Sequence, residues 1–119
     1  KPLKDDPNVR RTIAQIVTDT AVAKGLSTRF VCAAKSGGKP PTIESSQYKL
    51  CMNECSMRTA NAALDLMGPG AQLKPREDGA PAGGRFERSY RYTVVDTIGG
   101  GTSEIQKNII SRRKLGLPT

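Results

Sequence analysis

Three consecutive glycines, Gly99 to Gly101, lie near the C-terminal end of the chain and are followed at once by Thr102 and Ser103. Glycine accepts backbone conformations that other residues avoid, so this run ends a helix and lets the main chain approach another group closely. The hydroxyl pair suits the start of a new helix, and the spacing from Ser103 to Gln106 fits a capping box. Because free amide groups at a helix start favour an anionic or phosphate-bearing ligand, this bend is the first candidate for a binding site.

Before this bend, apolar residues recur at intervals of three and four, which is typical of amphipathic helices. A first helix is expected to begin at Asp6, with Pro7 in the first turn, where a missing amide does no harm. It should end near residues 36–38. A second helix is expected from Thr42 to Met67, and its two apolar stripes indicate that it is covered on more than one side.

The second half of the chain predicts shorter elements. Residues 68–84 are rich in glycine, proline and charge, which predicts a loop. A third helix is expected over 85–97, and a fourth over 103–115, after the glycine run. The buried side of the third helix is expected to consist of Phe86, Tyr90, Val94 and Val95. The predicted fold class is therefore all-α, with four helices.

Charge and cysteine content narrow the classes of function. The formal charge of +8 is compatible with nucleic-acid binding, but the charges are spread, aromatic residues make up only 4%, and no nucleic-acid motif occurs. No apolar run is long enough to span a membrane. Cys51 and Cys55 share a helix face, but without histidine or a fourth thiol they do not predict a closed zinc site, so core packing is expected. The odd cysteine count, with Cys32 as the third, favours a reducing cytoplasm.

Residues 98–106, Ile-Gly-Gly-Gly-Thr-Ser-Glu-Ile-Gln, and the basic helix after them closely resemble the C-terminal signature of acyl-CoA dehydrogenases, flavoenzymes that desaturate acyl-CoA thioesters between Cα and Cβ. Residues 1–10 and 64–70 are similar to two further segments of that family, and Arg91 falls where the family keeps an arginine. The resemblance implies the four-helix up-and-down bundle of the family's C-terminal domain, lacking its first helix. Residues 1–119 would then be a partial domain that contacts FAD and takes part in oligomerisation.

The resemblance also implies FAD as the cofactor and two groups of residues that contact it. The first group lies at the glycine bend and comprises Gly100, Gly101, Thr102, Ser103 and Glu104. The second lies at the end of the second helix, near FAD bound largely by a neighbouring subunit, and comprises Asp65, Leu66, Met67, Gly68 and Pro69. Asp65 and Pro69 depart from the glutamine and glycine common in the family.

Gly100 stands where many members of the family carry the glutamate that removes the α proton. The resemblance therefore implies that these 119 residues hold no catalytic base and that the fragment alone is inactive. No metal is expected either, because the chain has no histidine and no fourth thiol. The implied partners are an acyl-CoA substrate, the missing N-terminal and middle domains, and the other subunits of a homo- or heterotetramer. The implied metabolic process is β-oxidation. Two alternatives stay open: a non-catalytic partner subunit of a heteromeric dehydrogenase, and an unrelated basic helical binding module.

Overall fold

The computed structural model describes residues 2–118, which form four α-helices and no strand. The helices are α1 (Pro7–Lys35), α2 (Thr42–Met67), α3 (Arg85–Ile98) and α4 (Ser103–Arg113). Three short 3-10 helices accompany them: η1 (Leu3–Asp5), η2 (Pro69–Gln72) and η3 (Pro81–Gly84). The predicted all-α class is confirmed. Lys1 and Thr119, which fall within the predicted domain, lie outside the described residues.

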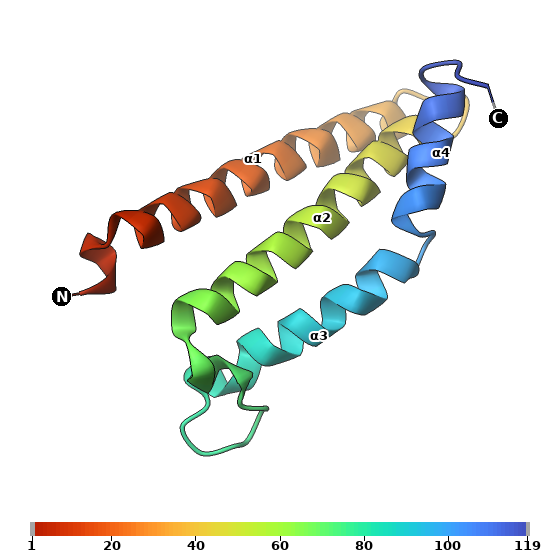
Figure 1. The fold of residues 1–119 in the computed structure, drawn as a ribbon. Coiled ribbons are helices and arrows are strands. Elements are labelled where there is room, and N and C mark those ends of the chain that lie inside the picture. The colour runs from red at the N-terminus through yellow and green to blue at the C-terminus, as the bar shows by residue number, and fades with distance from the viewer. Residues whose placement is uncertain (1, 119) are drawn as a thin grey trace.

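Helix α2 is the centre of the bundle. It contacts α1, α3 and α4, so the prediction that it is covered on more than one side is confirmed. Figure 1 shows α1 and α3 flanking α2 and running antiparallel to it, while α4 lies beside the first turns of α2. The connection between α3 and α4 therefore sits against the N-terminal half of α2, and the connection between α2 and α3 lies at the opposite end.

The helix boundaries follow local chemistry. Asp6 caps α1, and its carboxylate accepts hydrogen bonds from the amides of Asn8 (2.8 Å) and Val9 (3.4 Å). The predicted bounds of α2 are confirmed, and α3 runs one residue beyond its predicted end. Helix α4 ends at Arg113, two residues early, because the chain turns back at Gly116, whose φ is +68°.

The predicted buried face of α3 is wrong. Tyr90, Val94 and Val95 are 41%, 58% and 55% exposed, and Phe86 is half-buried. The residues of α3 that are buried are Glu87 and Thr93. Helix α3 packs mainly on α2, and it also contacts η2 and η3.

The bundle is elongated and has a small core. Its radius of gyration is 17.6 Å, whereas a compact chain of this length would have about 13.5 Å. Within residues 2–118, the buried apolar residues are all small: Ala23, Cys55, Ala60 and Ala71. Large apolar side chains on α1, α3 and α4 stay exposed. None of the helices described is both long and apolar enough to cross a lipid bilayer.

Candidate functional site

The glycine bend is a tight turn between two helices. Gly99 ends α3, and its amide donates to the carbonyl of Val95 at 2.8 Å. Gly100 and Gly101 then take φ values of +72° and +99°, in the left-handed region that favours glycine. A Cβ atom on Gly101 would lie 2.7 Å from Nε2 of Gln106, whereas one on Gly100 would meet only Cε of Lys49, at 3.5 Å. The two glycines therefore differ, because Gly101 is enclosed and Gly100 is open.

The predicted capping box of Ser103 and Gln106 is wrong by one residue. The N-cap of α4 is Thr102, whose hydroxyl accepts a hydrogen bond from the amide of Ile105 at 3.4 Å. The positive φ values of the two preceding glycines turn the chain earlier than the capping box requires. Gln106 is 6% exposed and donates from Nε2 to the carbonyl of Gly100 at 3.0 Å. Its role is to hold the bend rather than to cap the helix.

Lys49 of α2, which was not predicted as a site residue, supports the bend through hydrogen bonds. Lys49 of α2 donates from Nζ to the carbonyl of Asp96 at 2.7 Å and to Oδ1 of Asn53 at 3.0 Å. Asn53 is 3% exposed, and its Nδ2 atom has no hydrogen-bond partner within residues 2–118. Lys49 thus ties the end of α3 to α2 beneath Gly100. The only feature of the sequence that could have indicated this role was a charged residue within the apolar pattern of a central helix.

The amide groups of the bend are available to a ligand. No acceptor within the described part of the chain takes a hydrogen bond from the amides of Gly100, Gly101 or Thr102. Thr102 and Ser103 are half-buried rather than enclosed in the core, and Glu104 is exposed. The bend therefore combines free backbone donors, two hydroxyl groups and the positive end of a helix dipole, a donor set that suits a phosphate or a hydroxyl-rich group.

The second predicted group lies far from the first. Gly68 is the C-cap of α2, with φ +70°, and its amide donates to the carbonyl of Leu64 at 3.0 Å. Leu66 is half-buried, while Asp65, Met67 and Pro69 are exposed. Lys49, beside the bend, and Met67 are 18 residues apart on α2, which corresponds to about 27 Å along the helix axis. One chain therefore cannot bring both groups to the same end of one ligand.

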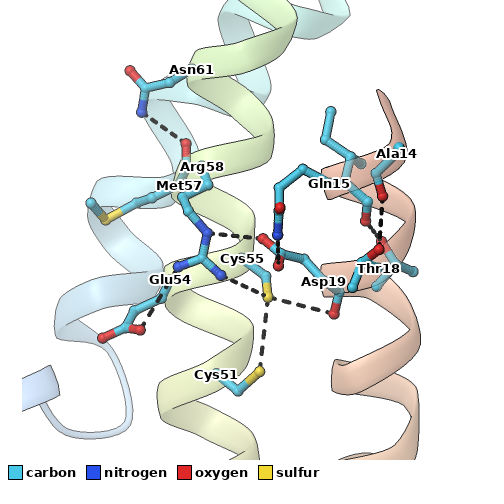
Figure 2. A network of polar contacts seen from close by, with 12 residues as sticks. Ala14, Gln15, Thr18, Asp19, Cys51, Glu54, Cys55, Met57, Arg58 and Asn61 are labelled. Atoms are coloured by element: carbon cyan, nitrogen blue, oxygen red, sulfur yellow. Dashed lines mark hydrogen bonds and ion pairs between the residues drawn. The ribbon is translucent and has the colours of Figure 1, made fainter. Parts of the chain in front are cut away.

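A polar network joins α1 to α2 at mid-length (Figure 2). Arg58 donates from Nε to Oδ2 of Asp19 at 2.9 Å, and Gln15 donates to the other carboxylate oxygen at 2.9 Å. The hydrogen bond from Arg58 has the largest effect in lowering the pKa of Asp19, and the hydrogen bond from Gln15 lowers it further. The thiol of Cys55 lies 3.8 Å from that of Cys51 and 3.7 Å from the carbonyl of Asp19. Burial, and then the bond to Cys51, raises the pKa of Cys55.

A groove of about 930 Å³ runs over α2 between α1 and α3. Its floor includes Tyr48, Met52 and Cys55, and its walls include Lys24 of α1 and Tyr92 of α3. The groove is mostly apolar. Among the described residues that line it, Asp96 is the only carboxylate. The groove therefore contains no pair of carboxylates that could share acid and base roles.

Comparisons with known proteins identify the family to which the chain is similar. The family described as "Acyl-CoA dehydrogenase, C-terminal domain" matches residues 1–115. The chain is 30% identical over 119 residues to acyl-CoA dehydrogenase FadE26 of Mycobacterium tuberculosis, covering 98% of this chain and 30% of that protein. It is 33% identical over 112 residues to acryloyl-CoA reductase (NADH) of Anaerotignum propionicum, covering 94% of this chain and 26% of the relative.

Among solved structures, the ChsE4-ChsE5 complex from Mycobacterium tuberculosis superposes with a TM-score of 0.88 at 29% identity. The match covers 98% of this chain and 30% of the solved chain. The chain thus spans about a third or less of the length of the relatives it matches.

Proposed function

The chain belongs to the acyl-CoA dehydrogenase family, and on this basis we propose that it is the C-terminal helical part of an FAD-dependent enzyme that desaturates an acyl-CoA thioester between Cα and Cβ. The observation that carries the proposal is the glycine bend, where the amides of Gly100, Gly101 and Thr102 have no acceptor within residues 2–118. This donor set fits the phosphate and ribose groups of the adenylate half of FAD. Residues 100–104 would hold that half.

FAD, when bound, would supply the hydride acceptor for the reaction. The residues of this chain would position the reacting groups. The amide of Gly100 is suited to donate to the thioester carbonyl, an oxyanion-type role that needs no side chain. Gln106 fixes the carbonyl of Gly100, and Lys49 fixes the end of α3, so the amide is held in place before substrate binds.

We assign the second group, Asp65 to Pro69, to FAD held by a neighbouring subunit. The separation of about 27 Å along α2 supports this assignment, because the two groups lie towards opposite ends of that helix. The exposed apolar residues of α3 are suited to an interface between subunits. Residues 1–119 would therefore form both an FAD-contacting and an oligomerisation unit, in a homo- or heterotetramer.

The proton at the α carbon needs a base that this chain does not supply at Gly100. Two carboxylates lie four residues from Gly100 in sequence: Glu104 is exposed and one helical turn further on, and Asp96 is half-buried in α3. We propose that the base comes from outside residues 2–118. The alternative is a non-catalytic subunit of a heteromeric dehydrogenase, which the structural match to a two-component complex supports. In either case the fragment alone would not turn over substrate.

The test is flavin binding by the full-length protein. We expect purified protein to carry a flavin absorption band that bleaches with an acyl-CoA substrate. A Thr102→Val and Ser103→Ala double variant should lose FAD affinity at least tenfold, because it removes both hydroxyl groups. Ser111→Ala is the matched control, since its hydroxyl bonds only to the carbonyl of Asn108 in its own helix. A colourless protein that does not take up added FAD would refute the proposal.

A second candidate is the reverse reaction. The relative that is 33% identical is named a reductase that uses NADH. The same assay distinguishes the two directions, because a reductase would oxidise reduced flavin when given an unsaturated acyl-CoA. Reduction of flavin by saturated acyl-CoA, with little turnover of the unsaturated compound, would favour desaturation.

A further inference from the structure

The fold gathers much of the positive charge of the chain at one end of the bundle. Residues 35–44 and 107–118 are distant in sequence, but the guanidinium of Arg113 donates to the hydroxyl of Thr42 at 3.1 Å. The end of α4 therefore lies beside the turn between α1 and α2 (Figure 1). The two segments make up less than a fifth of the chain, yet they carry +5 of its formal charge of +8.

The cations of these two segments are all exposed. They form the basic end of the bundle, which consists of Lys35, Lys39, Lys107, Arg112, Arg113 and Lys114. Every ion pair within residues 2–118 involves Arg58 or Arg91, so no carboxylate of the described chain pairs with a cation of the basic end. Glu44, the one acidic residue of the two segments, is half-buried. A surface with this balance of charge attracts an anionic partner.

Two exposed leucines accompany the basic end. Leu115 and Leu117 are 63% and 51% exposed, and they follow Lys114 directly. The chain turns back at Gly116, where φ is +68°, and the amide of Leu117 donates to the carbonyl of Ser111 at 3.0 Å. The backbone of this turn is thus bonded to the end of α4, while the two apolar side chains point into solvent beside the cations.

An anionic lipid surface matches both features of the basic end. Lys and Arg side chains attract its headgroups, and exposed apolar side chains enter the boundary between headgroups and acyl chains. Single-stranded nucleic acid fits less well, because its bases stack on aromatic side chains. The exposed aromatic residues within residues 2–118, Tyr90 and Tyr92, lie on α3 and not at the basic end.

We propose that the basic end, together with Leu115 and Leu117, docks the protein reversibly on the surface of an anionic lipid bilayer. The cations contact lipid phosphates, and the two leucines enter between the headgroups. The contact is peripheral and involves no covalent step. It does not depend on the flavin function proposed above, because it uses neither of the two groups of residues assigned to FAD.

The test is sedimentation of the full-length protein with vesicles. We expect tighter binding to equimolar phosphatidylcholine and phosphatidylglycerol than to phosphatidylcholine alone, by at least tenfold, and weaker binding as salt is raised. A variant that combines Lys35→Ala, Lys39→Ala and Arg112→Ala should lose at least tenfold in affinity, because each cation near an anionic surface contributes about fivefold. Arg113 is left unchanged, because it bonds α4 to Thr42.

The matched control combines Lys4→Ala, Arg10→Ala and Lys74→Ala. It removes the same charge from exposed positions at the opposite end of the bundle. Its affinity should change by about twofold at most, because these positions lie several Debye lengths from the basic end.

The leucines are tested in the same way. Leu115→Ser combined with Leu117→Ser should weaken binding to the anionic vesicles at least tenfold, because it removes the apolar side chains that enter the boundary with the acyl chains. Leu3→Ser is the control, since Leu3 is also 63% exposed but lies at the opposite end of the bundle.

The proposal is overturned if the protein does not sediment with anionic vesicles, if the two triple variants lose affinity equally, or if the double leucine variant binds as the unaltered protein does. Tighter binding to duplex DNA than to vesicles at equal phosphate concentration would also overturn it, in favour of nucleic acid. Circular dichroism identifies a variant that fails to fold. If the basic-end variant is one, Lys39→Ala alone decides the result, because Lys39 lies outside the helices.

Discussion

The bundle has two glycine-bearing connections that differ in how closely other atoms approach the glycine. The connection between α2 and α3 contains Gly84, where an added Cβ would lie 2.4 Å from the backbone nitrogen of Pro75. The connection between α3 and α4 contains Gly100, where an added Cβ would meet nothing closer than 3.5 Å. Both glycines have a positive φ, of +74° and +72°. The first is required by backbone packing, and the second leaves its space open.

This difference distinguishes two reasons why a chain can require glycine at a position. At Gly84 two segments of main chain pass so closely that no side chain fits, which is a requirement of the fold itself. At Gly100 the fold leaves room for a side chain and favours glycine only through the positive φ, so any further requirement for glycine there would come from a ligand. The comparison therefore predicts large effects on stability at the first connection, and effects on binding at the second.

The largest effect is expected for Gly84→Ala. The new methyl group would collide with backbone atoms that cannot rotate away, and the residue would be held at a positive φ, at a combined cost of about 3 kcal/mol or more in unfolding free energy. Gly79→Ala is the matched control, because Gly79 has a φ of +78° with nothing within 4 Å. It should lose about 1 kcal/mol. Equal losses in urea denaturation would contradict the packing explanation.

The next effect is expected for Lys49→Met. This change removes two hydrogen bonds from a charged donor, leaves Oδ1 of Asn53 without a partner, and should cost about 2 kcal/mol. Lys107→Met, on the exposed surface of α4, should cost less than 0.5 kcal/mol, as roughly expected for a surface site. Hydrogen exchange of the α3–α4 connection provides a second measurement. If exchange there is unchanged, Lys49 does not support the bend.

Gly101→Ala should have an effect of similar size to that of Lys49→Met. Its Cβ would contact the end of the flexible Gln106 side chain rather than backbone. Strain at the positive φ costs about 1 kcal/mol, and displacement of the Gln106 bond costs about 1 kcal/mol more. In a chain that already carries Gln106→Ala, the second cost should disappear. Thermal unfolding of the two single variants and the double variant measures this coupling, and additive losses would show that Gln106 is not displaced.

The long elements could be predicted from the sequence with little error. The bounds of α2 and the Asp6 cap of α1 follow from apolar periodicity and from local hydrogen bonds, which depend on neighbouring residues. The exposed face of α3 could not be predicted, because Tyr90, Val94 and Val95 repeat at helical spacing whether or not a partner covers them. Periodicity identifies an apolar face but does not show what lies against it.

In the candidate site too, features set by neighbouring residues could be predicted, and features set by tertiary packing could not. The resemblance of residues 98–106 to a known signature indicated the bend, and hydroxyl chemistry indicated a cap near its end. The choice between Thr102 and Ser103 depended on the φ values of two glycines, which local sequence rules do not determine. Lys49 was missed because its acceptor, the carbonyl of Asp96, lies 47 residues away in sequence. Contacts of this range follow from the packing of α2 on α3 and not from any short motif.

The smallest change in stability, and the most direct test of the comparison, is expected for Gly100→Ala. Gly37, in the turn between α1 and α2, has the same φ of +72° and no atom within 4 Å of an added Cβ. Gly37→Ala and Gly100→Ala should therefore both lose about 1 kcal/mol of unfolding free energy. They should differ in function, because only the Gly100 methyl group would enter the proposed site of the thioester.

For the full-length enzyme we expect Gly100→Ala to lower kcat/KM about tenfold, since a displacement of reacting groups by a fraction of an ångström is enough for such a loss. Gly37→Ala should leave kcat/KM unchanged. If both variants lose the same stability and neither loses activity, Gly100 is a turn residue like Gly37. The α3–α4 connection would then be shaped by the fold alone, as the α2–α3 connection is, and the difference between the two would be one of packing density and not of function.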